Sequence, residues 1–443
     1  MKKIFLLFSL SSAMLTVISC NRFLDEKSDS LLAVPETLDD NQAILDRYLI
    51  MGLNPVSAEI SADDFYLSES NFNTMGVEAE KRLHTWEPDY VSGSDWKNVY
   101  NRINIFNNVL FNIEHYKIPM ADNVKGQALV WRAGAYLEAA QIWCLAYDPA
   151  TADQNLGLPL RLNPDMNIPS VRSTLRQTYS QILTDLHAAL PLLPQQQIAA
   201  SRPSKVTALG FLSRAYLFMG DYANALKYGL QALEINNQLM NFNTLNPTTS
   251  YPVPDLNVEV LLPTSMSYNA FLTVTTAKIP ETLYESYHEN DLRKSIFFRK
   301  DNDGAALFRG NYGGSSTRKN CLAVDELYLI VAESYARLNK PEEAISWLNS
   351  LLVTRWKTGT YMPISITDSS DALIKIRNER RKELLFRGLR WADLKRYNKE
   401  GAAITLTRTF NGKTYTLPPN DLRYAIAIPE EVIEMTGMPQ NPR

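Results

Sequence analysis

The sequence predicts a mainly α-helical protein whose helix pairs form an α-superhelical scaffold, with long irregular loops and one minor β-hairpin. Over most of the chain, apolar residues recur three and four positions apart, which is the spacing of one helix face. The composition, with 45% hydrophobic and 21% charged residues among 443, is typical of a folded chain. The net charge of −3 excludes a strongly basic nucleic-acid binder, so we expect no nucleic-acid partner.

Residues 1–19 are predicted to be a signal peptide. Two lysines precede an almost wholly apolar run over 4–18, which is too short and wrongly flanked for a stable membrane span. The run ends Val17-Ile18-Ser19-Cys20, which resembles a bacterial lipobox with valine in place of the usual leucine. We therefore expect lipidation of Cys20, followed by a tether over 20–34. An ordinary secreted protein with a chance cysteine is the alternative.

The first half of the remaining chain predicts three longer helices. Apolar residues at helical spacing cover 96–113, 129–147 and 178–193. The second of these helices ends before Asp148-Pro149, and Pro194 closes the third. Cys144 and Cys321 lie in apolar helical patterns, so we expect two buried thiols; export would also permit a disulfide between them, which spacing alone does not decide.

Two helix pairs, near 206–235 and 327–354, share one pattern. In the first pair a turn at Gly220 separates the helices, and small residues at Ala225 and Ala232 allow close packing. The second pair repeats these offsets, and both resemble a tetratricopeptide helix pair. The pairs are not tandem copies at the usual spacing of about 34 residues. Other parts of the chain must therefore complete the stack.

The segment between these pairs, 236–320, loses helical periodicity and is rich in proline, glycine and aromatic residues. A long irregular segment in a compact protein is usually functional or disordered, and the aromatic content argues against disorder. Further on, 371–398 is predicted as one charged helix. Residues 405–417 are predicted as a β-hairpin that turns at Asn411-Gly412.

Sequence motifs for catalysis or metal binding are absent. The four histidines show no metal-binding spacing, and Gly412-Lys413-Thr414 lacks the earlier glycine of a phosphate-binding loop. Acidic pairs occur, but a glycosidase needs two carboxylates at a fixed separation, which sequence does not show. We therefore expect no catalytic residues, no metal and no cofactor.

A series of motifs in a fixed order resembles one known family. After Cys20 and Phe23-Leu24-Asp25, the blocks are Trp96-x3-Tyr100-x2-Ile103-x3-Asn107, Arg132-Ala133-x-Ala135-Tyr136, Gly157-Leu158-Pro159-Leu160, Arg202-x-Ser204-Lys205, Glu326-Leu327-Tyr328-Leu329 and Pro439-Gln440-Asn441-Pro442. The most specific block is Arg377-Asn378-Glu379-Arg380-x2-Glu383-Leu384-x-Phe386-x-Gly388-x-Arg390-Trp391-x-Asp393-Leu394-x-Arg396. Together they resemble the SusD/RagB family of outer-membrane nutrient-uptake lipoproteins of Bacteroidetes. Arg387 stands where that family usually has glutamate.

This resemblance implies one SusD-like helical domain over 35–443, with the loop-rich 236–320 segment as the ligand region. It implies a surface-facing, lipid-anchored protein of the outer membrane that captures a nutrient and passes it to a SusC-like TonB-dependent transporter. Most members of the family bind oligosaccharides, and the RagB branch handles peptides. The resemblance implies no catalytic step.

The charged block over 379–396 is interpreted as scaffold. On one helix, Glu383 and Arg387 are four positions apart, and Arg390, Asp393 and Arg396 are three apart, so we expect stabilising ion pairs. Trp96, Tyr100 and Asn107 are likewise interpreted as packing residues.

Candidate ligand residues come from two loop regions, 63–96 and 265–318, because sugar binding needs exposed aromatic rings beside polar side chains. The candidates are Tyr66, Asn71, Phe72, Trp86, Tyr90, Tyr268, Arg309 and Tyr312. The competing interpretation is that each aromatic ring packs against its own scaffold.

Three alternatives to oligosaccharide transport stay open. A groove rich in asparagines and acids would favour a peptide ligand in the same transport role. Buried or disordered aromatic loops would favour a lipid-anchored scaffold that binds only protein. A cleft with two opposed carboxylates would favour a hydrolase.

Overall fold

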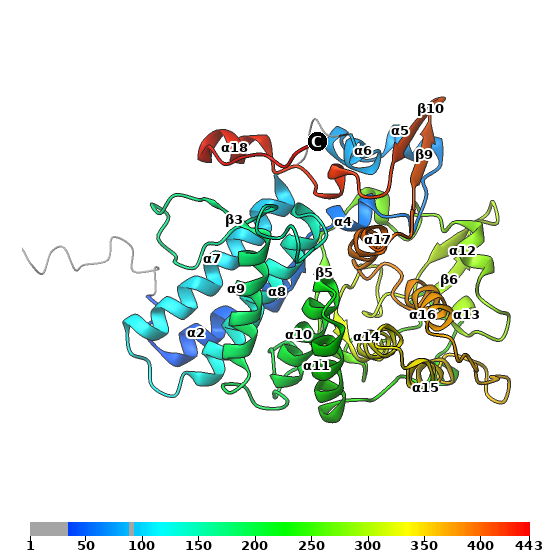
Figure 1. The fold of residues 1–443 in the computed structure, drawn as a ribbon, viewed down its shortest axis with the longest axis horizontal. Coiled ribbons are helices and arrows are strands. Elements are labelled where there is room, and N and C mark those ends of the chain that lie inside the picture. Colours follow the sequence, from blue (N-terminus) through cyan, green and yellow to red (C-terminus); the bar gives the residue numbers. More distant parts are fainter. Residues whose placement is uncertain (1–33, 88–92) are drawn as a thin grey trace, which may run out of the picture.

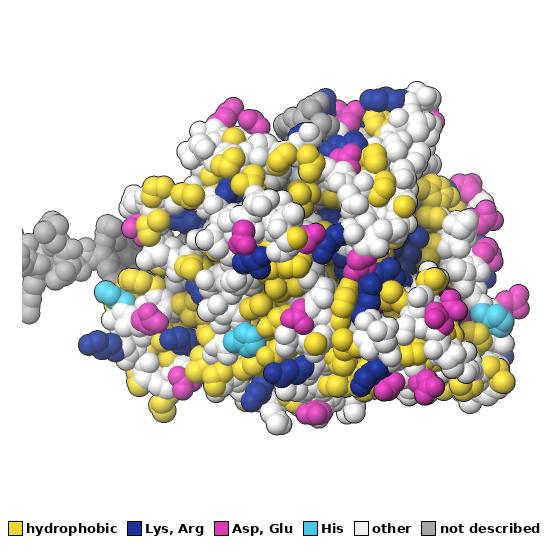
Figure 2. Space-filling model, in the orientation of Figure 1, with side chains coloured by type: hydrophobic (Ala, Val, Ile, Leu, Met, Phe, Trp, Pro, Cys, Tyr) yellow, Lys and Arg dark blue, Asp and Glu magenta, His cyan; other side chains and the backbone are white. Residues whose placement is uncertain are grey.

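The computed structural model describes residues 34–87 and 93–443 and is mainly helical (Figure 1). The predicted signal peptide, Cys20, almost all of the predicted tether and Tyr90 lie outside these residues. Within the described part of the chain, no helix has the length and apolar character needed to cross a bilayer. On the face shown in Figure 2, acidic and basic side chains are interspersed among apolar ones.

A continuous stack of helices forms the larger part of the molecule. In chain order its members are α7 (Ser94–His115), α8 (Asp122–Trp143), α9 (Leu175–Ala189), α10 (Lys205–Met219), α11 (Tyr222–Ile235), α14 (Val324–Arg337), α15 (Pro341–Leu352) and α16 (Ser369–Glu383). Each helix packs on the next, including α11 on α14. The two predicted pairs are α10/α11 and α14/α15, and they are direct neighbours. The chain between them is looped out to the side, where α12, α13 and β6 lie in Figure 1.

Small residues and a glycine turn explain why α10 and α11 pair so closely. Gly220 ends α10 with a φ of 78°, a conformation that glycine adopts without strain. The Asp221 side chain then caps α11 by accepting a hydrogen bond from the Asn224 amide at 3.1 Å. Ala225 and Ala232 are fully buried, and Ser213 Oγ donates to the Ala225 carbonyl at 2.8 Å. The helices therefore approach with little side-chain volume between them.

Short elements precede the stack and cover one end of it. They are α2 (Leu38–Leu45), α3 (Tyr48–Met51), β1 (Leu53–Asn54), α4 (Ser57–Ser61), α5 (Glu69–Thr74) and α6 (Glu78–His84). Helix α2 packs on α7 and α8, while α4 packs on α6 and on α17 (Arg390–Lys399). The chain end adds a short 3-10 turn, η3 (Leu422–Tyr424), and α18 (Glu430–Thr436).

The strands of the described residues form two-stranded pairs. The pairs are β1 with β5 (Ser265–Met266), β2 (Leu156–Pro159) with β3 (Arg172–Thr174), β4 (Val260–Leu262) with β8 (Leu322–Ala323), β6 (Phe298–Lys300) with β7 (Ala306–Phe308), and β9 (Leu406–Phe410) with β10 (Lys413–Leu417). The last pair is the predicted hairpin. Its turn residues Asn411 and Gly412 have φ values of 51° and 74°, as a two-residue type I′ turn requires.

The 236–320 segment has short elements and contributes most of a second hydrophobic core. These elements include η1 (Phe242–Thr244), η2 (Ala270–Leu272), α12 (Glu281–Glu285) and α13 (Arg293–Phe297). Most of the aromatic rings of the segment point inward, and Phe271, Tyr287 and Phe297 are almost fully buried. The aromatic content of this segment therefore serves mainly its own packing.

The predicted single helix over 371–398 is wrong in one respect. Helix α16 ends at Glu383 and α17 begins at Arg390, because Phe386 and Gly388 adopt φ values of 57° and 73° that no helix accommodates. The expected pairing of Glu383 with Arg387 is therefore absent, since Arg387 lies between the helices. Arg387 instead contacts Asp325 at 3.1 Å.

Other ion pairs of this block also differ from the expectation. Arg396 pairs with Asp393 at 2.8 Å as predicted, but Arg390 reaches Asp63 on a distant segment at 2.7 Å. Most of these side chains are buried, whereas the sequence suggested pairs along a helix surface. The interpretation as scaffold is consistent with this burial.

A buried ion cluster joins the 236–320 segment to the helical stack. Arg355 Nε contacts Glu383 at 2.7 Å, and its Nη2 contacts Glu259 at 2.7 Å, with all three side chains fully buried. Arg293 contacts Glu383 at 2.9 Å from the other side. Burial raises the pKa of Glu259 to about 7, while Arg355 opposes this shift. The two parts of the molecule therefore share one charged interior.

Candidate functional site

Three of the predicted ligand residues lie in the hydrophobic interior. Phe72 stacks on Phe410 with ring centroids 3.8 Å apart. Trp86 is 5% exposed and donates from Nε1 to the Ser61 carbonyl at 3.0 Å. Tyr312 is 2% exposed, and its hydroxyl donates to Glu259 at 2.7 Å. In this structure these rings pack against their own scaffold, as the competing interpretation expected.

Two polar candidates have structural contacts. The backbone N–H of Asn71 donates to Ser68 Oγ at 3.2 Å, which caps α5. The Arg309 guanidinium donates to the carbonyls of Pro247, Thr249 and Ser295 at 2.6–2.9 Å. Arg309 therefore holds neighbouring loop segments together.

The remaining described candidates, Tyr66 and Tyr268, expose their rings. Tyr66 is 44% exposed and lies in a short antiparallel bridge with Lys278. Tyr268 is 84% exposed, which is the largest exposure of any described aromatic side chain. Tyr268 also stands at the edge of a groove, so it is the candidate around which a site can be built.

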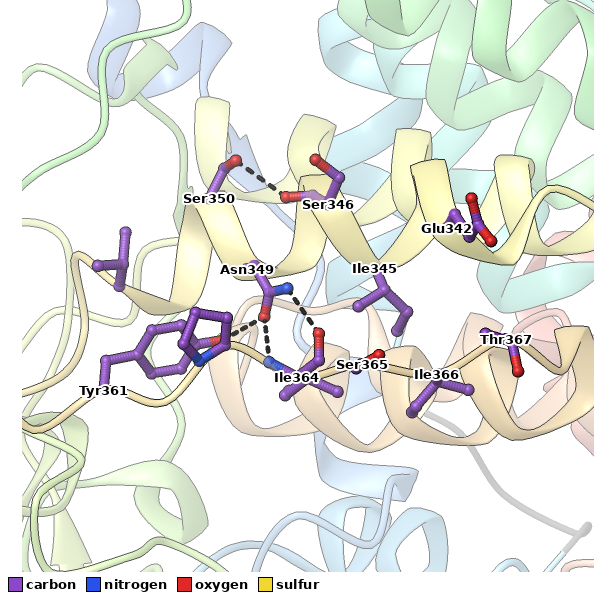
Figure 3. A pocket seen from close by; sticks show the side chains of 12 residues that line it. Glu342, Ile345, Ser346, Asn349, Ser350, Tyr361, Ile364, Ser365, Ile366 and Thr367 are labelled. Carbon is purple, nitrogen blue, oxygen red and sulfur yellow. Dashed lines mark hydrogen bonds between the residues drawn. The ribbon is translucent and has the colours of Figure 1, made fainter.

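A larger hollow lies elsewhere, between α15 and the segment 361–367, with a volume of about 540 Å³ (Figure 3). Asn349 joins its two walls. Its side-chain oxygen accepts from the Tyr361 hydroxyl at 2.5 Å and from the Ile364 amide at 2.9 Å, and its amide group donates to the Ile364 carbonyl. These polar groups form hydrogen bonds with one another, so we interpret this hollow as the place where the loop 361–367 packs against α15.

A second hollow, of about 350 Å³, is lined by side chains from 196–206 and 235–238. It is polar and contains several amide side chains, but no aromatic ring lines it. It therefore lacks the stacking surface that a sugar ring needs.

The groove beside Tyr268 has a volume of about 220 Å³ and combines apolar and polar walls. It is formed by α4, α6, the first turn of α7, the 267–269 peptide and residues 426–427. Apolar side chains on its walls include Val56, Ile60, Leu83, Trp143 and Ile426. Polar side chains include Ser57, Glu80, Ser94, Asp95, Asn98, Ser267 and Asn269. We call this feature the Tyr268 groove.

The peptide that carries Tyr268 is fixed on both sides. The Ser267 amide donates to the Asn54 carbonyl at 2.9 Å. Asn269 accepts from the Phe271 amide at 2.9 Å and donates to Glu80 at 2.6 Å. The exposed ring is therefore presented from an ordered backbone, which reduces the entropy that a stacked ligand would otherwise cost.

Asp95 fastens the floor of the groove. Its Oδ2 accepts from the Val56 amide at 2.9 Å and from both the amide and the hydroxyl of Ser57, at 2.9 and 2.5 Å. Burial raises the pKa of Asp95, while the hydrogen bonds from Ser57 and Val56 oppose the shift. The start of α7 is thereby joined to the start of α4.

Sequence reasoning did not select Glu80, Asp95 or Asn98 as candidates for the site. Glu80 and Asp95 lie in the first turns of α6 and α7, where a polar residue commonly serves as a cap, and Asn98 lies one turn further along α7. Glu80 follows Val77 at the spacing of a capping box, and the Val77 amide donates to it at 3.1 Å. A search for helix starts beside aromatic loops would have found them.

The described residues show no other obvious reactive centre. No group of three or more His, Cys, Asp or Glu side chains is placed to hold a metal ion within 34–87 and 93–443. Cys144 and Cys321 are separate buried thiols, as predicted, and burial raises the pKa of each to about 11. Thiols with such high pKa values are poor nucleophiles.

Comparison with known families gives three matches along the chain. Residues 22–217 match a SusD-like family described as starch-binding and associating with the outer membrane, and residues 313–435 match the SusD family. Residues 206–239 match the tetratricopeptide repeat, in agreement with the α10/α11 pair. SusD-like protein P2 of Formosa agariphila is 26% identical over 283 residues, which are 50% of this chain and 56% of that protein. The match thus spans about half the length of this relative.

Solved structures have the same fold. A SusD superfamily protein from Bacteroides thetaiotaomicron superposes with a TM-score of 0.76 at 22% identity, over 92% of this chain and 100% of the other. A SusD-like carbohydrate binding protein from Bacteroides vulgatus gives a TM-score of 0.68 at 22% identity, over 90% and 96%. Residues 22–217 and 313–435 are thus similar to SusD-family proteins, and the solved structures show that the helical stack has the same fold.

Proposed function

We propose that this protein binds an oligosaccharide in the Tyr268 groove at the cell surface and passes it to a SusC-like TonB-dependent transporter. In this proposal a lipid on Cys20 anchors the protein in the outer membrane, and residues 35–443 act as one binding unit. The starch-binding description of the matched family supports a carbohydrate ligand. The observation that carries the proposal is the 84% exposed Tyr268 ring on a fixed peptide beside a mixed groove.

The groove suits a sugar because it offers both surfaces that a sugar presents. The Tyr268 ring can stack against the apolar CH face of a pyranose, while Asn98, Glu80 and Asp95 can hydrogen-bond its hydroxyl edges. The groove has a volume of about 220 Å³, so a long oligosaccharide would extend over its rim. Moderate affinity follows, and moderate affinity favours release to a transporter.

Binding without catalysis fits the role of the two carboxylates. Asp95 accepts three hydrogen bonds that hold α4, and Glu80 accepts two that hold α6 and Asn269. A glycosidase instead needs one carboxyl as a proton donor and another as nucleophile or base across the scissile bond. We assign these side chains to positioning and recognition.

A peptide ligand is the second candidate, because Asn98, Asn269 and two acids also suit the polar groups of a peptide backbone. A screen of oligosaccharides and peptides against the full chain in detergent, followed by calorimetry, distinguishes the two. We expect saturable glycan binding, weakened roughly tenfold or more in Tyr268→Ala and largely kept in Tyr268→Phe. Saturable peptide binding without any glycan would replace the oligosaccharide in the proposal.

A matched control is Tyr116→Ala. Tyr116 is also a partly exposed tyrosine, but it follows the last turn of α7, about 33 Å from the first turn that lines the groove. Glycan affinity should be unchanged in this variant. Co-purification of the lipidated protein with a TonB-dependent transporter from native membranes would test the partner.

A further inference from the structure

The charged side chains that line the Tyr268 groove are all acidic. Its described lining contains two carboxylates, Glu80 and Asp95, and no lysine, arginine or histidine. Within the described residues neither carboxylate forms a salt bridge, and both hold their positions through hydrogen bonds to amides and a hydroxyl. The groove therefore presents two carboxylates and no cationic side chain to whatever enters it.

Arg102, a cation that acts on Asp95, forms its own contacts away from the groove lining. Arg102 lowers the pKa of Asp95 slightly against the effect of burial, so its field reaches the groove. Its Nη1 donates, however, to the Met51 carbonyl and to Asn54, and its Nη2 lies 3.7 Å from Glu138. The Arg102 guanidinium therefore points toward Met51, Asn54 and Glu138 and does not line the groove.

The start of α7, which carries the positive end of a 22-residue helix, is also occupied by acids. Asp95 lies in its first turn. Glu431 of α18 reaches the same end, because a Cβ placed on Gly93 would lie only 2.1 Å from its Oε1. The helix end thus offers no free site for a sulfate or carboxylate.

We infer that the Tyr268 groove selects uncharged glycans and rejects glycans that carry sulfate or uronate groups at the bound units. The inference rests on the proposed function and specifies the ligand class of that same groove. All three hydrogen bonds to Asp95 go to Oδ2, which leaves Oδ1 to accept a sugar hydroxyl. A hydroxyl can donate to a carboxylate, whereas a sulfate or carboxylate offers only acceptors and like charge.

The test uses matched pairs of ligands. Neutral hexasaccharides of glucose, xylose, mannose and galactose, and a chemically sulfated counterpart of each, are titrated into the full chain in detergent at 50 and 500 mM salt. We expect at least one neutral member to bind saturably, with affinity that changes less than twofold between the two salt concentrations. Its sulfated counterpart should bind at least tenfold more weakly at 50 mM salt, and less so at 500 mM because salt screens the repulsion.

A charge variant adds a second readout. Glu80→Gln removes one negative charge but keeps a side chain that can cap α6, so it should bind the sulfated ligand threefold to tenfold better than the wild type does. Glu78→Gln on the same helix, which removes an exposed charge outside the groove, should leave the preference unchanged.

Two results would overturn the inference in different ways. Tighter binding of the sulfated member that weakens with salt and is lost in Tyr268→Ala would refute the charge selection while leaving the groove as the glycan site. Absence of binding by every member of the panel, neutral or sulfated, would overturn the proposed function together with the inference.

Discussion

Replacement of Arg355 by methionine tests whether the buried ion cluster holds the 236–320 segment to the helical stack. The Arg355 side chain is fully buried and bridges Glu383 and Glu259 at 2.7 Å each. It also donates to the Met240 carbonyl at 2.7 Å. Methionine fills a similar volume but leaves two buried carboxylates and one carbonyl without this partner.

The expected loss of unfolding free energy in Arg355→Met depends on which contacts Glu383 and Glu259 retain. Glu383 retains Arg293 at 2.9 Å, and Glu259 retains the Met240 amide and the Tyr312 hydroxyl, both at 2.7 Å. Glu259 nevertheless loses its nearest cation. Breaking one partner from a buried ion pair typically costs 3–5 kcal/mol, and we expect about 4 kcal/mol for Arg355→Met at pH 7.

The unfolding free energy lost in Arg355→Met should depend on pH. Burial already raises the pKa of Glu259 to about 7, and loss of Arg355 raises it further. A carboxyl with a raised pKa in the folded state contributes stability at low pH that is lost as the pH rises. The cost of Arg355→Met should therefore be smaller at pH 6 than at pH 8.

Urea denaturation followed by tryptophan fluorescence measures these changes. Adding Glu259→Gln to Arg355→Met should recover about 1–2 kcal/mol, because it removes the stranded charge. Lys125→Met, which breaks an exposed pair with Glu114, is the matched control and should cost less than about 0.5 kcal/mol. A loss below about 1 kcal/mol for Arg355→Met would refute the view that this cluster joins the two parts.

Three further changes test other parts of the account. Burial raises the pKa of Glu59 to about 8, so the wild type should lose stability as the pH rises from about 5 to 8, and Glu59→Gln should show a shallower decline in pH-dependent denaturation. Trp86→Ala should cost about 3–5 kcal/mol in unfolding free energy yet leave glycan affinity intact, because Trp86 lies in the core; selective loss of affinity would contradict this. Gly157→Ala should lower the unfolding free energy by about 1–3 kcal/mol, since its Cβ would lie 2.2 Å from the Thr174 carbonyl oxygen; an unchanged denaturation midpoint would show that β2 can shift.

Much of the fold could be predicted from the sequence, because local residue patterns determine its helices and its hairpin. Helical periodicity located the stack, the small residues of α10 and α11 identified a tetratricopeptide-like pair, and Asn411-Gly412 identified the hairpin. The break between α16 and α17 was missed, because the charged pattern continues through Phe386, a residue without turn preference that here adopts a positive φ.

The site was less predictable because exposure is a tertiary property. Phe72, Trp86 and Tyr312 were predicted in the same kind of loop as Tyr268, and only packing in the two hydrophobic cores decides which ring faces solvent. Glu80 and Asp95 lie at helix starts, where acidic residues are common whether or not a ligand binds. No local pattern shows that these helix starts converge on one groove.

The most direct test of the central claim is a crystal structure of the protein with a neutral oligosaccharide from the binding screen. The account predicts one sugar ring stacked on Tyr268, with hydroxyl groups within about 3.2 Å of the Glu80 or Asp95 carboxylate. A glycan bound in the hollow between α15 and 361–367, with Tyr268 left in solvent, would contradict the account.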